Sequence, residues 1–299
     1  MGQPIFDRSF EARYGECVIL RPTVRRIVAR NPNAFTFHGT GTYILGQGDV
    51  AVIDPGPDDP AHLDAILSAL IGETVTAILV THTHRDHSPL ATALKAATGA
   101  PTYGYGPHGG DQNAESVEEG ADRDFVPDHF LRDGDLVSAA GWTVEAVHTP
   151  GHTSNHLCFA YLDRNVLFSG DHVMGWSTSV ISPPDGDMAA YLASLRKLLD
   201  RDEEIFYPTH GNPIENPKQH VTDFIDHRLA REDQILACIT AGQHRIDQMV
   251  PSIYRDVPAK LHPAAARSVL AHLIHLWEQG RVACDAPYPK LGSEFSRIA

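Results

Sequence analysis

Histidine and aspartate residues gather directly after strand-like stretches in five separate parts of the chain. The stretches are apolar or alternate apolar with polar residues, and helix-like stretches separate most of them. The polar residues that follow the strands are Asp54; His82, His84, Asp86 and His87; His152; Asp171; and His210. Strand ends in a layered α/β fold meet at one edge of the sheet, so distant residues can share one site. The sequence therefore predicts an α/β domain with its chemistry at that edge.

Capping and turn signals delimit the elements between these sites. Asp59 and Pro60 predict a helix that ends near Gly72, and a second helix runs from Pro89 to about Ala97 before Gly99. An apolar stripe predicts a third helix over 188–199. We expect strands over 77–80, 142–146 and 205–207, and hairpins over 43–53 and 157–168.

The pattern changes near residue 216 to helices with little strand. Helices are predicted over 224–239 and 264–279, followed by a short strand over 281–284. We therefore divide the chain into a catalytic domain, residues 1–215, and a helical C-terminal domain, residues 216–299. A winged-helix-like unit and a helical layer packed on the main domain both fit this pattern.

Charge and composition narrow the class of protein. The 299 residues hold 38 Asp and Glu against 24 Lys and Arg, and the net charge of −14 repels polyanions on average, so nucleic acid is not the default partner. No apolar run approaches the ~18 residues of a membrane span, and residues 1–7 show no signal pattern. The four scattered cysteines are typical of reduced, mostly buried thiols. We expect a cytoplasmic protein with a small-molecule substrate and no membrane partner, and self-association into a homo-oligomer stays open.

The residue types at the strand ends indicate a metal site. Imidazole nitrogens and carboxylate oxygens together suit zinc and related first-row ions. In the loop His82-x-His84-x-Asp86-His87, the two histidines two residues apart point the same way along an extended backbone. The turn then directs Asp86 and His87 to a second position. One loop can thus serve two metal ions.

This loop and three later segments resemble the motifs of the metallo-β-lactamase-fold hydrolase superfamily. The later segments are Pro150-Gly151-His152-Thr153, Phe168-Ser169-Gly170-Asp171 and Thr209-His210-Gly211, and the similarity covers roughly residues 17–215. It implies a four-layer αβ/βα sandwich with a binuclear site between the sheets. It also implies that His82, His84 and His152 hold one metal, that Asp86, His87 and His210 hold the other, and that Asp171 bridges them. We expect two Zn²⁺ ions, with Fe or Mn as alternatives.

The C-terminal segment adds a second resemblance. Residues 261–266, 270–273 and 278–282 are similar to the winged-helix-type segment of the lactamase-beta-2-like branch of this superfamily. The resemblance implies one of two activities. The branch includes a metal-dependent endoribonuclease for single-stranded RNA, and related enzymes hydrolyse thioesters. Family membership does not choose between them.

The candidate catalytic residues are Asp86, Asp54 and His156. Two metal ions ~3.5–4 Å apart can hold a bridging hydroxide, which is the nucleophile that this ligand set is expected to supply. The role that the resemblance implies for Asp54 is to orient the metal loop, and the alternative is a turn residue of Asp-Pro-Gly. His156, four residues after His152, is a candidate proton donor to the leaving group or a contact for a substrate phosphate.

We therefore predict a binuclear, zinc-dependent hydrolase of a small acyl substrate: a thioester, ester, lactone or β-lactam. The first alternative is cleavage of single-stranded RNA, which requires a basic groove. A mononuclear iron enzyme that oxidises thiol compounds is a weaker alternative, since Asp86, His87 and His210 complete a second ligand set. A regulatory DNA-binding module is disfavoured, because Arg267 is the only Lys or Arg between residues 264 and 279.

Overall fold

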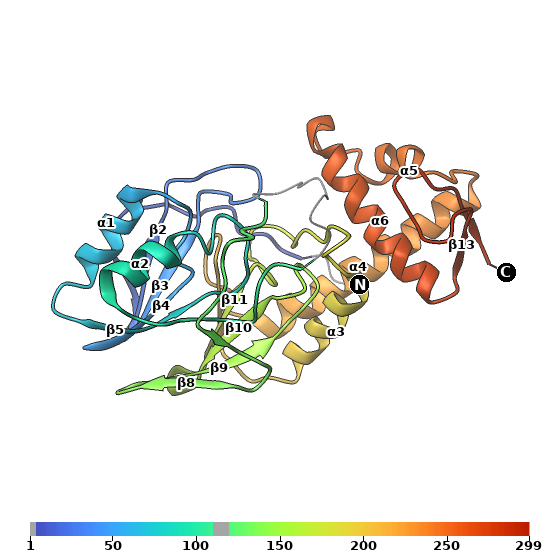
Figure 1. Cartoon of the computed structure of the whole chain (residues 1–299). Helices are drawn as coiled ribbons and strands as arrows, with labels where there is room; N and C mark the ends of the chain where they lie inside the picture. The colour runs from blue at the N-terminus through green and yellow to red at the C-terminus, as the bar shows by residue number, and fades with distance from the viewer. Residues whose placement is uncertain (1–3, 110–119, 299) are drawn as a thin grey trace.

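Two β-sheets lie face to face in the computed structural model, which describes residues 4–109 and 120–298 (Figure 1). The first sheet has seven strands in sequence order: β1 (Val18–Arg21), β2 (Val24–Val28), β3 (Gly41–Gln47), β4 (Asp49–Ile53), β5 (Thr74–Leu79), β6 (Thr102–Gly104) and β7 (His129–Phe130). The second has the order β12-β11-β10-β9-β8, with bounds β8 (Leu136–Ala139), β9 (Trp142–His148), β10 (Leu157–Tyr161), β11 (Val166–Gly170) and β12 (Ile205–Pro208).

Alternation along the strands divides the apolar side chains between two faces of each sheet. In β3, Tyr43 and Leu45 enter the core between the sheets, whereas Ile44 points to the outer face. In β11, Phe168 enters the same central core and Leu167 points outward. Side chains two residues apart share a face, so each strand serves two apolar layers at once. This is why these strands read as continuous apolar runs.

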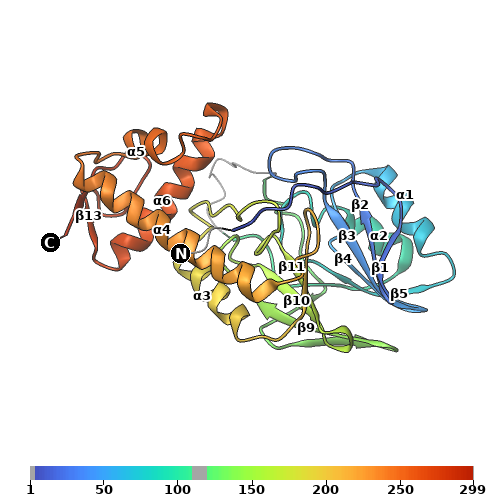
Figure 2. The same ribbon diagram turned by 180° about the vertical axis from the view of Figure 1, so that it is seen from behind.

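Helices cover both outer faces. Helices α1 (Pro60–Ala69) and α2 (Leu90–Thr98) pack Ile66 and Leu94 against the first sheet. Helix α3 (Met188–Leu199) packs Leu192 against the second sheet, joined by Phe224 of α4 (Pro217–Thr240). The helix, sheet, sheet and helix layers follow one another across the molecule in both views (Figures 1 and 2). The predicted four-layer sandwich is confirmed.

The local signals mark the helix ends as expected. The Asp59 side chain accepts a hydrogen bond from the Ala61 amide at the start of α1, and Gly99 ends α2 in the left-handed conformation. Strands β1 and β2 were not predicted, and in β2 the apolar residues are interrupted by arginines. Arg25 and Arg26 lie within β2, which pairs with β3 along its whole length.

The C-terminal part forms its own apolar core (red and orange in Figure 1). It contains the end of α4, α5 (Ile246–Ile253), α6 (His262–Glu278) and the strand pair β13 (Val282–Cys284) and β14 (Phe295–Arg297). Helix α5 and strand β14 were missed. Two short 3₁₀ helices, Leu162–Arg164 and Ala259–Leu261, connect other elements.

Two further observations concern the expectations from composition. Among the described residues, none of the helices is both long enough and apolar enough to cross a membrane. All four cysteines are free, but only Cys158 is buried. The expectation of mostly buried thiols is therefore wrong, since Cys17 is exposed and Cys238 and Cys284 are partly exposed.

Candidate metal centre

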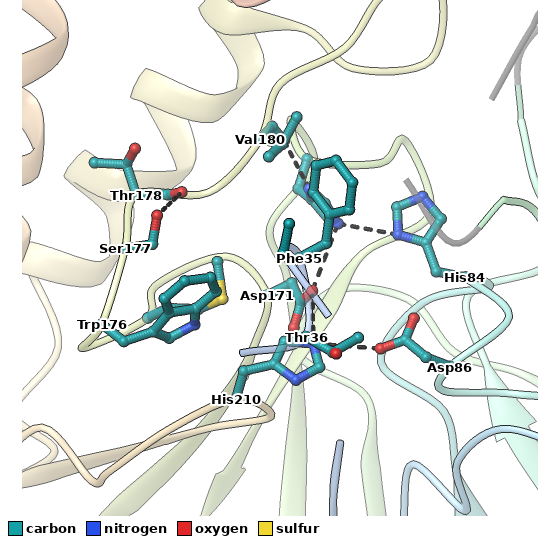
Figure 3. A pocket seen from close by; sticks show the side chains of 13 residues that line it. Phe35, Thr36, His84, Asp86, Asp171, Trp176, Ser177, Thr178, Val180 and His210 are labelled. Carbon is teal, nitrogen blue, oxygen red and sulfur yellow. Dashed lines mark hydrogen bonds and ion pairs between the residues drawn. The ribbon is translucent and has the colours of Figure 1, made fainter. Parts of the chain in front are cut away.

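The ends of four strands deliver all seven predicted ligands to one place, and the end of a fifth strand delivers Asp54 beside them. Asp54 follows β4, the 82–87 loop follows β5, His152 follows β9, Asp171 follows β11 and His210 follows β12. The ligand side chains line or lie beside one cavity between the two sheets (Figure 3). All seven are buried or partly buried, and His84 is the one that is partly exposed.

Three imidazoles form the first group. His84 Nδ1 lies 3.0 Å from His82 Nε2 and 3.2 Å from His152 Nε2. His82 and His84 come from one loop, whereas His152 arrives from the second sheet. The three ligand atoms lie within 4.8 Å of one another, which is close enough for one ion to contact all three.

The second group contains a carboxylate and two imidazoles. Asp86 Oδ2 lies 3.2 Å from His87 Nε2 and 3.3 Å from His210 Nε2. Their ligand atoms also fall within 4.8 Å of one another. Asp86 thus belongs to a different group from His82 and His84, whereas His87 lies near both groups, because the ligand atoms of His82, His87 and Asp171 also fall within 4.8 Å of one another.

Asp171 lies between the two groups. Its Oδ2 atom is 3.4 Å from His210 Nε2, 3.6 Å from His87 Nε2 and 3.9 Å from His152 Nε2. It thus contacts members of both sets from β11, a strand of the second sheet. This is the position that a bridging carboxylate would occupy.

Burial and charge divide the histidines into two kinds. Burial, reinforced by neighbouring imidazoles, lowers the pKa of His82 and His84 well below the ordinary value, which keeps these rings neutral. Burial opposes charge on His210 too, but Asp171 and Asp86 outweigh it and raise its pKa to about 10. The pKa of His87 is likewise raised, against burial, by Asp86 and Asp171. Two buried carboxylates thus require positive charge beside them.

The donor set fits divalent cations. Asp171 Oδ1 and His87 Nε2 are buried and have no hydrogen-bond partner, although buried polar atoms are nearly always bonded. The raised pKa values of His87 and His210 reflect the demand of these carboxylates for positive charge, which bound cations would also meet. Imidazole and carboxylate ligands of this kind suit zinc and its first-row neighbours.

Asp54 lies directly behind the 82–87 loop. Its Oδ2 atom accepts hydrogen bonds from His87 Nδ1 at 2.9 Å and from the Thr81 hydroxyl at 2.8 Å, and its Oδ1 atom accepts from the Thr81 amide. Because the carboxylate only accepts, Nδ1 of His87 carries a proton and Nε2 faces Asp86. These are the contacts that the predicted orienting role requires.

His156 lies outside the cavity lining. The ring is fully buried, its Nε2 atom accepts a hydrogen bond from the Asp171 amide at 3.2 Å, and its Nδ1 atom is 2.9 Å from the Thr149 hydroxyl. Both nitrogens are thus engaged behind Asp171. This geometry positions the Asp171 backbone and gives His156 no open path to a substrate, contrary to the role expected for a proton donor.

Several functional contacts carried no signal in the sequence. The Val180 carbonyl accepts from His152 Nδ1 at 2.7 Å, and the Gly39 carbonyl is 3.1 Å from His210 Nδ1. The Thr40 hydroxyl donates to Asp86. Backbone carbonyls are present at every residue, so only the fold can reveal which of them face a ligand.

The cavity has an uncharged wall of apolar and hydroxyl side chains beside the ligands (Figure 3). Its described lining residues other than the ligands are Ala34, Phe35, Thr36, Met174, Trp176, Ser177, Thr178 and Val180. Trp176 also stacks on Phe37, with ring centroids 4.7 Å apart. The loop after Asp171 was expected to border the site and does so, whereas residues 34–36 were missed.

Comparisons with known proteins agree with this arrangement. Residues 36–210 match the model of the metallo-beta-lactamase superfamily, and residues 246–286 match that of the beta-lactamase associated winged helix domain. The chain is 34% identical over 281 residues to a beta-lactamase-like protein 2 homolog of Drosophila melanogaster, covering 88% of this chain and 90% of that protein. It is 27% identical to an atrochrysone carboxyl ACP thioesterase of Aspergillus chevalieri, over 85% and 80% of the two chains.

Solved structures share the fold. A beta-lactamase domain protein from Burkholderia ambifaria superposes with a TM-score of 0.78 over 97% of this chain and 96% of its own, at 22% identity. A metallo-beta-lactamase family protein from Thermus thermophilus gives a TM-score of 0.73 over 94% and 100%, also at 22% identity. Both similarities extend through the C-terminal helices.

Proposed function

Because this chain belongs to the metallo-beta-lactamase superfamily of hydrolases, we propose that it is a binuclear, zinc-dependent hydrolase of a small acyl substrate. The seven candidate ligands support a two-ion site. His82, His84 and His152 would hold one ion, Asp86, His87 and His210 would hold the other, and Asp171 would contact both. When bound, such ions supply Lewis acidity and lower the pKa of water.

The uncharged wall of the cavity is the observation that favours an acyl substrate over RNA. Among the described lining residues, none is Lys or Arg. A nuclease holds its substrate through contacts with phosphates, for which cationic side chains dominate. Phe35, Met174 and Trp176 instead offer apolar surface to the uncharged part of an acyl group. This favours acyl transfer to water over cleavage of RNA.

Within the acyl class we propose a thioester. The relative from Aspergillus chevalieri is named as a thioesterase, which makes this bond the first to be tested. The chain's own residues would position the reaction: Asp54 orients His87, the Val180 carbonyl orients His152, and His156 fixes the backbone of Asp171.

A hydrolysis panel on metal-loaded protein tests this function. Acyl thioesters, a lactone, a β-lactam and single-stranded RNA would be compared, with Zn, Fe and Mn measured on the same sample. We expect two zinc ions per chain and the highest kcat/KM for a thioester. RNA cleavage without thioester hydrolysis would overturn the substrate assignment, and a single iron would overturn the binuclear one.

Asp171→Ala serves as the site control for this panel. Loss of an outer contact to a metal ligand already costs about 10–100-fold. Removal of a carboxylate that faces both groups should therefore lower kcat/KM by at least ~100-fold and reduce the metal content. Unchanged turnover in this variant would show that the activity does not come from this site.

A further inference from the structure

Arg228 is a buried cation that no feature of the sequence singled out. It lies on α4 and is 3% exposed, and its guanidinium carbon lies 5.2 Å from the centroid of the Tyr191 ring. Its Nη2 atom donates a hydrogen bond to the Ser179 carbonyl, and Nε is buried with no hydrogen-bond partner. In the part of the chain that the structure describes, no carboxylate forms an ion pair with it. Burying such a charge is unfavourable unless it is paired and hydrogen-bonded, so the few contacts of Arg228 matter.

The Ser179–Val180 segment that Arg228 contacts reaches two candidate metal ligands. The Ser179 hydroxyl donates to the Asp171 carbonyl at 2.5 Å and lies 2.8 Å from the His172 carbonyl. The next residue, Val180, accepts the hydrogen bond from His152 Nδ1 through its carbonyl. Because that carbonyl can only accept, the proton of His152 lies on Nδ1, and Nε2 is left for the cavity.

Helix α3 supports the same backbone from the other side. The Tyr191 hydroxyl donates to the His172 carbonyl at 2.9 Å, and the face of the Tyr191 ring lies beside the Arg228 guanidinium. Arg228 therefore contacts both the segment that holds His152 and the ring that holds the residue after Asp171. These contacts connect α4 to His152 of the first group and to Asp171 between the groups through one layer of residues.

We infer that Arg228 is a positioning residue for the metal centre, which fixes His152 and Asp171 by holding the Ser179–Val180 backbone. The inference rests on the proposed metal site but not on the identity of the substrate. It makes α4 a structural part of the active centre. A residue that merely attached α4 to the second sheet would affect stability alone.

Arg228→Met removes the charge and the donors while keeping an unbranched apolar stem. We expect its Zn²⁺ affinity, measured by competition with a chromophoric chelator, to fall by about 10–100-fold, as for other residues that orient ligands. The visible spectrum of the Co²⁺-substituted protein should change, and kcat on a thioester should fall more than KM rises. Arg228→Lys, which keeps the charge and one donor, should recover part of the affinity.

Arg231→Met is the matched control on the same helix. Arg231 donates to Gln234 and to the Ile253 carbonyl and lies over Tyr254, so its contacts stay within the C-terminal part. It should retain the wild-type affinity and Co²⁺ spectrum even if its melting temperature falls. Wild-type affinity and spectrum in Arg228→Met would overturn the inference.

Ser179→Ala tests the same positioning role of the Ser179–Val180 segment if Arg228→Met does not fold. It removes the hydroxyl that holds the Asp171 carbonyl and leaves the acceptor of Arg228 in place. We expect weaker Zn²⁺ binding, and a combined Arg228→Lys/Ser179→Ala variant should lose less than the product of the two single losses. Unchanged binding in Ser179→Ala would refute the connection. Since metal affinity is measured without substrate, an inactive wild type would count against the proposed function only.

Discussion

A single carboxylate, that of Asp54, decides how the metal loop is oriented. The residue has a φ of +47°, a left-handed conformation that Asp adopts more readily than most residues with a side chain. This turn sends the chain away from β4 while the carboxylate reaches back to Thr81 and His87. Turn chemistry and ligand orientation, which the sequence offered as alternatives, are thus two consequences of one residue.

His156→Gln separates a positioning role from proton donation. The amide oxygen of Gln can still accept a hydrogen bond from the Asp171 amide, but Gln cannot transfer a proton. We expect kcat to fall by less than about 10-fold with an unchanged pH profile, because His156 does not line the cavity. General acid catalysis contributes ~10²–10⁴-fold, so a loss of that size with normal metal content would restore the proton-donor interpretation.

At the scale of elements, the loop after β9 depends on a close approach to helix α3. Gly151 has a φ of +137°, and a Cβ atom there would lie 2.4 Å from the Tyr191 Cα atom. Its amide hydrogen-bonds the Thr153 carbonyl, and its own carbonyl accepts from the Asp187 amide at the start of α3. His152 is held at its position because the loop and the helix touch at this glycine.

Gly151→Ala should therefore affect the metal site as well as stability, whereas Gly99→Ala should affect stability alone. Gly99 also has a positive φ, +76°, but nothing lies within 4 Å of the Cβ position. We expect Gly99→Ala to cost about 1 kcal/mol with unchanged Zn²⁺ affinity. Gly151→Ala adds a steric clash of about 1–3 kcal/mol or more and should weaken Zn²⁺ binding. Urea unfolding measures the stability of each variant, and Zn²⁺ affinity is measured on the folded proteins; equal Zn²⁺ affinities of the two variants would contradict the close-packing argument.

At the scale of the whole molecule, a buried ion cluster joins α4 to α6. Glu232 is 1% exposed, and its carboxylate lies 2.7 Å from His275 Nδ1, 3.6 Å from His272 Nδ1 and 3.5 Å from an Arg281 nitrogen. Burial opposes its ionisation, but these histidines outweigh burial and lower the pKa of Glu232 to about 2. Burial lowers the pKa of His272 to about 4.

The lowered pKa values of Glu232 and His272 both make the C-terminal part less stable in acid. A carboxyl with a lowered folded-state pKa stabilises the fold above its unfolded pKa, and this contribution is lost as the pH falls from about 4.5 to 2. Since 2.5 pKa units correspond to about 3 kcal/mol, Glu232→Gln should be destabilised by roughly that amount at pH 7 and by less at pH 3. Urea unfolding at both pH values measures this, with the exposed Glu278→Gln on α6 as control. If the stability difference between the wild type and Glu232→Gln were the same at pH 7 and at pH 3, the assigned ionisation of Glu232 would be contradicted.

Much of this molecule could be predicted from the sequence, because strand alternation, caps and turn residues act over a few positions. The strand ends, the third helix over 188–199 and the seven clustered ligand candidates all depend on such local patterns. Of the elements that were missed, α5 does have such a pattern, since Ile246, Met249 and Val250 recur at helical spacing, whereas β2 does not. Strand β2 carries two arginines that find partners only in the fold, where Arg26 donates to the Gly211 carbonyl.

The sequence by itself determined the fold family, the chemistry of the ligands and the order in which strands present them. Only the tertiary structure decided that His156 lies behind Asp171, that Phe35 forms part of the cavity wall, and that Arg228 reaches Ser179. The physical reason is the range of the interactions. Propensity and periodicity act between neighbours in the chain, whereas burial and contacts with backbone carbonyls depend on which distant segments the closed sandwich brings together.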